Sequence, residues 1–278
     1  MSRVAAIQMA SGPNREANLL EAGRLLSEAA RAGAKLAVLP ECFDLMPRTD
    51  AERAAAAEAD GEGRVQDFLA GQARRHGLWL VGGTIPLRSA EPGRAFASCL
   101  VYAPDGQRVA RYDKIHLFDV ALTESGEQYH ESATTVPGNG TVVVETDLGC
   151  VGLAVCYDLR FPELFHALQR KGAELFVLPS AFTALTGQAH WDVLLRARAI
   201  ENLSYLVAAA QGGFHVSGRE TFGHSQVVDP WGAVLASRVS GAGVVVADVD
   251  LTQQRRIRGQ FPILEHHRLG IPAETETL

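Results

Sequence analysis

The sequence has few cysteines, no long apolar run and no basic segment. Four cysteines in 278 residues (Cys42, Cys99, Cys150 and Cys156) are too few for a disulfide framework. The apolar runs are short and interrupted, so none is a candidate membrane span. The first residues lack the apolar core of a signal peptide. With a net charge of −6, the chain shows no basic patch of the kind that binds nucleic acid. We therefore expect a cytoplasmic protein with free thiols that binds neither nucleic acid nor membranes.

Lysine is also scarce. It occurs only at positions 35, 114 and 171, and arginine supplies the other basic residues. An ammonium is compact and its pKa adjusts on burial, whereas a guanidinium is planar and stays charged. The few lysines are therefore candidates for positions that need an ammonium. The cluster Arg255, Arg256 and Arg258 is expected on the solvated face of one helix.

Short apolar, β-branched runs alternate with helical patterns, which is typical of βαβ units in an α/β protein. We predict strands at 3–8, 36–39, 150–156, 175–178, 206–210, 226–228 and 244–249. Helices are predicted at 15–32, 162–170, 190–202 and 251–260. No stretch has the composition of a linker, so a single domain spanning 1–278 is expected.

One segment resembles another at a constant offset of 139 residues. Residues 31–41 read RAGAKLAVLPE, and residues 170–180 read RKGAELFVLPS. Each predicts a helix end, a glycine stop and a buried strand that ends at proline. Convergent α-to-β corners would explain the match, and so would two similar halves that each bring a strand end to a shared site. In α/β folds, ligands favour the carboxyl ends of strands.

Cys156 follows an apolar strand in VGLAVCYDLRFPE (151–163) and precedes a polar turn and a helix that opens at Pro162. This setting suits a nucleophile, because the support is rigid and backbone N–H groups lie nearby. A buried cysteine is more often an inert small hydrophobic residue. The polar turn after Cys156 favours the nucleophile.

A thiol needs a base, since only a few per cent of it is ionised at neutral pH. The nine histidines lie in polar or mixed contexts, and no spacing singles one out. Glu41, directly after the strand 36–39, is the stronger candidate, because partial desolvation would make its carboxylate more basic. A helix or turn cap is the alternative role for Glu41.

Lys114 lies in RYDKIHLFD (111–119), where apolar and polar residues alternate as in an extended segment. Most lysines are simply solvated. An ammonium beside a tetrahedral oxyanion would instead stabilise acyl transfer by about 3 kcal/mol.

Taken together, LPE, KIHLFD and CYDLRFPE resemble the nitrilase superfamily of carbon–nitrogen hydrolases. PSAFTALTGQAHWDVLLRARAIEN (179–202) and GHSQVVDPWG (223–232) are similar to its Nit-type branch. The resemblance implies an α-β-β-α sandwich, a homodimer and no cofactor or metal. It makes Cys156 the nucleophile, Glu41 the general base, and Lys114 the oxyanion donor with help from the Tyr157 N–H. The family's second glutamate maps onto Glu131, with the neighbouring Glu127 and Glu124 as the alternatives.

Arg160 is four residues beyond Cys156 and suits bidentate binding of a substrate carboxylate. An ion pair with Asp158 or Glu163 is its alternative role. Phe182 and Thr186 follow the second corner and would form the opposite wall. With the resemblance, this predicts cleavage of deaminated glutathione to 2-oxoglutarate and Cys-Gly. An ω-amidase acting on 2-oxoglutaramate or 2-oxosuccinamate is the alternative.

Other classes fit the sequence less well. The segment 223–227 reads GHSQV and lacks the second glycine of the serine-hydrolase elbow. No cluster of His, Cys or carboxylates has metal-ligand spacing, and no nucleotide-binding glycine motif is present. A catalytically silent binding protein on the same fold stays open, since a fold does not fix a function.

Overall fold

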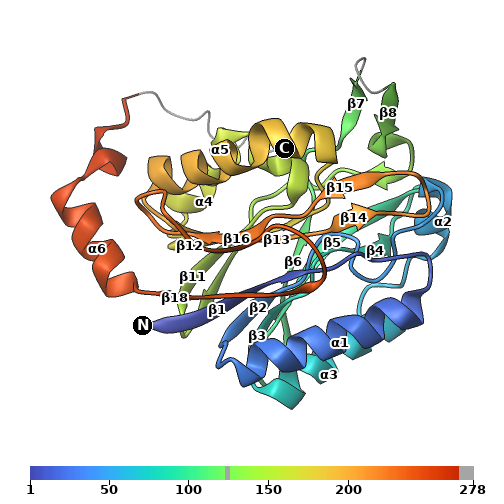
Figure 1. Ribbon diagram of the computed structural model, residues 1–278, viewed down its shortest axis with the longest axis horizontal. Helices are drawn as coiled ribbons and strands as arrows, with labels where there is room; N and C mark the ends of the chain where they lie inside the picture. Colours follow the sequence, from blue (N-terminus) through green and yellow to red (C-terminus); the bar gives the residue numbers. More distant parts are fainter. Residues whose placement is uncertain (123–125, 269–278) are drawn as a thin grey trace.

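The computed structural model describes residues 1–122 and 126–268. Two β-sheets form its centre, and helices cover their outer faces (Figure 1). The larger sheet has eight strands and runs in the order β18 (Gly243–Val249), β1 (Ser2–Gln8), β2 (Leu36–Val38), β3 (Trp79–Val81), β5 (Ala95–Tyr102) and β4 (Ile85–Arg88). Two further strands, β6 (Arg108–Asp113) and β9 (Thr135–Val136), also pair with β5.

The second sheet has six strands, in the order β10 (Val143–Thr146), β11 (Gly149–Leu153), β12 (Leu175–Ser180), β13 (Tyr205–Ala210), β16 (Ser225–Val228) and β17 (Val234–Arg238). Two hairpins stand apart from both sheets. One pairs β7 (Asp119–Leu122) with β8 (Glu127–His130), and the other pairs β14 (Gly212–Phe214) with β15 (Glu220–Phe222).

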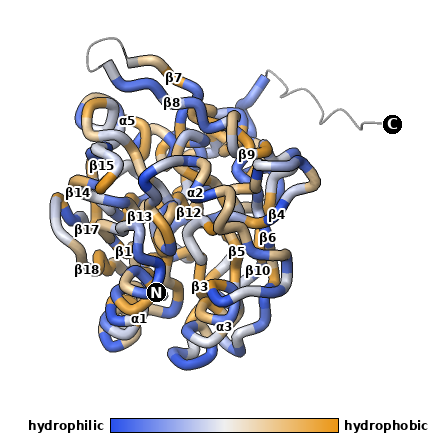
Figure 2. Tube along the Cα trace, turned by 90° about the vertical axis from the view of Figure 1, so that its right-hand side faces the viewer, coloured by the Kyte–Doolittle hydropathy of each residue, from blue (hydrophilic) through white to orange (hydrophobic). Residues whose placement is uncertain are grey.

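Helices α1 (Arg15–Arg31) and α3 (Arg64–His76) lie side by side on the outer face of the large sheet. On the second sheet lie α4 (Pro162–Arg170) and α5 (Ala184–Asn202) (Figures 1 and 2). The remaining helices are α2 (Asp50–Ala55) and α6 (Leu251–Gln260), with 3₁₀ turns η1 (Glu131–Ala133), η2 (Cys156–Arg160) and η3 (Ile263–His266). The predicted α/β fold with an α-β-β-α sandwich is therefore confirmed.

Strand β1 shows why the apolar runs are continuous rather than alternating. Val4 and Ala6 face the second sheet in one core, and Ala5 and Ile7 face α1 and α3 in another. Side chains of a strand point alternately to its two faces, so a strand buried on both faces needs apolar residues throughout.

Among the described residues, no helix is both long and apolar enough to cross a bilayer. The single domain spanning 1–278 stays a prediction.

The two corners that match in sequence also match in hydrogen bonding. Gly33 N–H donates to Ala30 O at 2.9 Å, and Gly172 N–H donates to Gln169 O at 2.9 Å. Both glycines have positive φ, 85° and 93°, which residues with a Cβ rarely adopt. Each corner leads into a parallel strand, β2 or β12, and the residues just beyond these strands, Glu41 and Ala181, line the same pocket. The carboxyl end of each of these strands thus contributes to one site.

Three sequence predictions differ from the structure. Helix α5 begins at Ala184 instead of 190, and its first turns pack closely on Phe222 at Gly187, where a Cβ would lie 2.4 Å from the Phe222 side chain. Strand β11 ends at Leu153 rather than at Cys156. Arg258 is not simply solvated, since its Nη2 donates to Ser204 Oγ at 2.8 Å and to two backbone carbonyls.

Candidate active site

The site lies where the carboxyl ends of strands from both sheets meet. Glu41 follows β2 of the large sheet, and Cys156 follows β11 of the second sheet. The sheets touch at this edge through a parallel bridge between Met9 and Gln211. The Gln211 amide nitrogen donates to the Glu41 carbonyl at 3.0 Å and to Ser11 Oγ at 2.8 Å. One carboxamide therefore ties the Glu41 backbone to the junction of the two sheets.

The turn between β3 and β4 supports the Glu41 segment from the other side. Gly83 has φ 57°, and a Cβ at this position would lie 2.1 Å from the carbonyl oxygen of Pro40. Only glycine permits this approach. The next residue, Thr84, accepts a hydrogen bond from the Cys42 N–H at 3.0 Å. The backbone on both sides of Glu41 is thus fixed.

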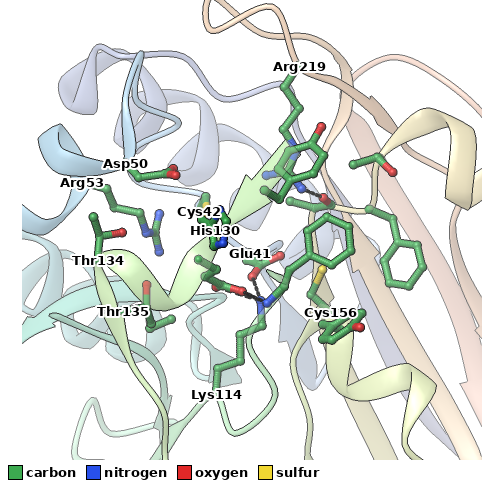
Figure 3. A pocket seen from close by; sticks show the side chains of 18 of the residues that line it. Glu41, Cys42, Asp50, Arg53, Lys114, His130, Thr134, Thr135, Cys156 and Arg219 are labelled. Atoms are coloured by element: carbon green, nitrogen blue, oxygen red, sulfur yellow. Dashed lines mark hydrogen bonds and ion pairs between the residues drawn. The ribbon is translucent and has the colours of Figure 1, made fainter. Parts of the chain in front are cut away.

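Lys114 directly follows β6, and 2% of its side chain is exposed. Its Nζ donates to Glu41 Oε1 at 2.9 Å and to both carboxylate oxygens of Glu131, at 2.9 and 2.8 Å. The Phe118 N–H donates to Glu131 Oε2 at 2.7 Å. The ammonium is therefore held between two carboxylates (Figure 3).

Among the three candidates for the second glutamate, Glu131 is the one placed against Lys114. Glu127 lies on β8 and shares a hydrogen bond with the Tyr129 side chain. Glu124 lies outside the described residues. The position of Glu131 agrees with the sequence prediction, and its role stays a prediction.

Cys156 opens the turn η2 with φ 49°, in the left-handed region that costs a residue with a Cβ about 1–2 kcal/mol. Its side chain faces the Glu41 carboxylate and Ala181, just beyond β12, in one pocket. The sulfur is nearly buried and lines a pocket. A strained backbone held in place by its surroundings is frequent at reactive sites.

The buried carboxylate of Asp158 organises the Cys156 turn. Its Oδ2 accepts from the Tyr112 hydroxyl at 2.6 Å and from the Val155 N–H at 2.8 Å. Its Oδ1 accepts from the His116 N–H at 3.1 Å and lies 2.7 Å from His116 Nδ1. The segment before Cys156 is thus connected to the segment after Lys114.

Burial and charge fix the protonation states of the three central groups. Burial would raise the pKa of Glu41, but the charge of Lys114 and the hydrogen bond from Cys156 hold it below its ordinary 4.5. The expectation of a more basic Glu41 was therefore wrong, because the nearby ammonium outweighs desolvation. Burial and the negative charge of Glu41 raise the pKa of the Cys156 thiol well above 9.0. Although burial opposes it, attraction by Glu131 and Glu41 raises the pKa of Lys114 well above 10.5. At neutral pH the site holds a carboxylate, a thiol and an ammonium.

The pocket also contains the other residues predicted to bind substrate: Tyr157, Arg160, Phe182 and Thr186. The Arg160 guanidinium carbon lies 5.8 and 5.2 Å from the ring centroids of Tyr157 and Phe182. Its Nη1 donates to His190 Nδ1 at 3.2 Å. The alternative ion pair with Asp158 or Glu163 is not formed. Between residues 1–122 and 126–268, no carboxylate is in ion-pair contact with Arg160.

A family model described as carbon-nitrogen hydrolase matches residues 3–258. The chain belongs to the carbon–nitrogen hydrolase family. It is 45% identical over 269 residues to the deaminated glutathione amidase of Homo sapiens, covering 95% of this chain and 82% of that one. It is 37% identical over 266 residues to omega-amidase NIT2 of Xenopus tropicalis, covering 96% and 95%. Among solved structures, Nit3 of Saccharomyces cerevisiae, a nitrilase-superfamily member, superposes with a TM-score of 0.84 at 32% identity and 94% coverage of each chain.

As a member of this family, the protein is a hydrolase of carbon–nitrogen bonds. The rival serine hydrolase is not supported by the position of Ser225, whose hydroxyl accepts a hydrogen bond from the Ala210 N–H inside the second sheet. Within the described part of the chain, no group of three His, Cys, Asp or Glu side chains could hold a metal ion.

Two arginines of this carbon–nitrogen hydrolase line the pocket without having been predicted. Arg53, on α2, donates to Leu45 O and Thr84 Oγ1, both at 3.1 Å, and is attracted by Glu41 and Glu131. Arg219, just before β15, donates to Ala181 O. Neither has a local sequence signal. Arg53 lies on the short helix α2 and Arg219 in the turn between β14 and β15, and the place of each at the pocket depends on distant parts of the chain.

Proposed function

We propose that this protein is an amidase that cleaves a small carboxylate-bearing amide through a thioester on Cys156. The substrate we propose is deaminated glutathione, which would give 2-oxoglutarate and Cys-Gly. The observation that carries the proposal is the contact between Lys114 and the carboxylates of Glu41 and Glu131, in the pocket that the Cys156 thiol also lines. Relatives named deaminated glutathione amidase, at 40–45% identity, support the substrate.

In the first step, Glu41 takes the thiol proton as Cys156 Sγ attacks the amide carbon. The carbonyl oxygen becomes an oxyanion, which Lys114 and the Tyr157 N–H stabilise. Protonation of Glu41 weakens its hold on Lys114 Nζ, so one N–H of the ammonium becomes free as the oxyanion forms. The C–N bond then breaks, the amine leaves with the proton from Glu41, and a thioester remains.

In the second step, water attacks the thioester and gives its proton to Glu41. Collapse of the second tetrahedral intermediate breaks the C–S bond, and the thiolate takes the proton back from Glu41. The net reaction adds one water to the amide and gives an acid and an amine. Glu131, fixed by the Phe118 N–H, keeps Lys114 in place through both steps.

The test is turnover by the Cys156→Ala variant. We expect it to lose amide hydrolysis entirely while its circular dichroism and unfolding midpoint stay close to those of the wild type. Mass spectrometry of quenched wild-type reactions should show the acyl adduct on the peptide that contains Cys156. Full activity in Cys156→Ala would refute the mechanism, and a protein that hydrolyses no amide would point to the silent binding protein.

An ω-amidase is the second candidate, because the Xenopus tropicalis relative carries that name. The two substrates share the 2-oxo acid portion that Arg160 would bind, and differ in the leaving group. Comparison of kcat/KM for deaminated glutathione and 2-oxoglutaramate decides between them. A large preference for 2-oxoglutaramate would make the protein an ω-amidase.

We also propose a cytoplasmic homodimer. The four cysteines are unpaired, as suits a reducing compartment. Large apolar side chains on and around the outer face of α5 support association: Val193, Ile200, Trp231 and Phe261 are 68%, 42%, 62% and 46% exposed. Sedimentation at micromolar concentration tests this, and a monomer would contradict it.

A further inference from the structure

One wall of the pocket is a row of aromatic rings with a guanidinium at each end. Tyr157 and Phe118 have ring centroids 5.1 Å apart, and Phe118 and Tyr129 are 5.0 Å apart. At one end, Arg160 lies against Tyr157; at the other, the guanidinium carbon of Arg219 lies 5.3 Å from the Tyr129 centroid. All five residues line the pocket that contains Cys156.

The Cys156 sulfur lines the same pocket as both guanidiniums. In Figure 3, Arg219 enters from the side opposite to Lys114 and points into the pocket. The positive charges of the site are thus spread around the point of attack instead of gathered on one side.

Arg219 has hydrogen-bonding capacity to spare. Its Nη2 donates to Ala181 O, whereas its buried Nε has no acceptor among the described residues. In the same part of the chain, no carboxylate forms an ion pair with it. A buried donor without an acceptor costs free energy, and a guanidinium can bind a carboxylate through two parallel N–H groups. An anionic ligand would satisfy both the charge and the free donor.

From this arrangement we infer that Arg219 binds a carboxylate on the leaving-group side of the scissile amide, while Arg160 binds the carboxylate on the acyl side. The inference rests on the proposed function and refines its substrate class: an amide with a carboxylate on each side of the C–N bond. Deaminated glutathione has this form, because its leaving group, Cys-Gly, ends in a carboxylate. 2-Oxoglutaramate lacks the second carboxylate, since its leaving group is ammonia.

The test compares two substrates that differ only at that carboxylate: deaminated glutathione and its analogue with the glycine carboxyl converted to a primary amide. The wild type should prefer the free acid. In Arg219→Gln this preference in kcat/KM should fall by about tenfold to a hundredfold, as for loss of a hydrogen-bonded charge. Arg219→Lys should restore part of it.

Arg53→Gln is the matched control, because it removes one positive charge from the same pocket on a different side of Glu41 (Figure 3). It should leave the ratio for the two substrates near the wild-type value. Arg160→Gln should instead lower kcat/KM for both substrates together, because both carry the acyl-side carboxylate.

Each possible result has a separate meaning. If Arg219→Gln lowers kcat/KM equally for both substrates, its role is to hold Ala181 and the inference is wrong. The inference also fails if the wild type does not distinguish the acid from the amide, or if Arg53→Gln changes the ratio as much. A wild type that cleaves 2-oxoglutaramate alone overturns the inference and leaves the amidase class intact. A wild type that cleaves no amide overturns the proposed function itself.

Discussion

Replacement of Asp158 by asparagine tests how the nucleophile turn is held. The carboxylate accepts bonds from Tyr112, Val155 and His116, whereas an amide offers one acceptor oxygen and an NH₂ group. The Tyr112 hydroxyl can turn and the His116 ring can change tautomer to accept from the NH₂ group. In either orientation of the amide, however, one backbone N–H, that of Val155 or of His116, loses its acceptor.

A buried N–H left without an acceptor costs about 1–3 kcal/mol, and the remaining bonds lose their charge assistance. We therefore expect Asp158→Asn to lower the free energy of unfolding by about 2–4 kcal/mol. Urea unfolding measures this change. An unchanged m-value would show that the variant and the wild type expose the same surface on unfolding, so that their free energies can be compared. kcat should fall as well, because the same turn positions the Cys156 sulfur.

Asp60→Asn is the control for this experiment. Asp60 pairs with Arg108 and Arg111 at a partly exposed site, where such ion pairs contribute no more than about 1 kcal/mol. If Asp158→Asn costs less than about 1 kcal/mol, or no more than Asp60→Asn, the Asp158 carboxylate does not hold the turn.

Two further predictions follow from the central groups. The value of kcat/KM should stay flat between about pH 6 and 8. The Glu41 carboxylate is lost only as the pH falls below 4.5, and the Lys114 ammonium only as it rises above 10.5; a midpoint inside the flat range would contradict these shifts. Cys156→Gly should be more stable to urea than Cys156→Ala by about 1 kcal/mol, because glycine adopts φ 49° without strain. Equal stability of the two variants would show that this backbone is not strained.

The parts of the fold that local pattern determines could be predicted. The corners at Gly33 and Gly172, and the strands that follow them, depend on helix stops and buried apolar runs that are written in adjacent residues. The sequence correctly predicts that Cys156 follows a buried strand, but it does not predict the left-handed backbone conformation of this residue. Strand β11 ends three residues earlier, at Leu153, and Val155 stays extended with its N–H bonded to Asp158, so the chain turns at Cys156 itself, where φ is 49°.

Only those site residues that lie in a recognisable sequence motif could be predicted. Glu41, Lys114 and Glu131 were named from short segments, and the structure brings these three together. Arg219 was missed because its place in the pocket depends on where the β14–β15 hairpin lies against the rest of the molecule. The net direction of the Glu41 pKa shift also required three dimensions, since burial and the ammonium of Lys114 act in opposite directions.

Glu41, the proposed proton acceptor, and the Cys156 sulfur follow strands of different sheets of the sandwich. The two sheets are joined at the bridge between Met9 and Gln211. A slip of one layer over the other by an ångström would part the thiol from Glu41 while every strand kept its neighbours. Hydrolysis therefore reports on the docking of the two layers, a property that spectroscopic measures of helix and strand content do not detect.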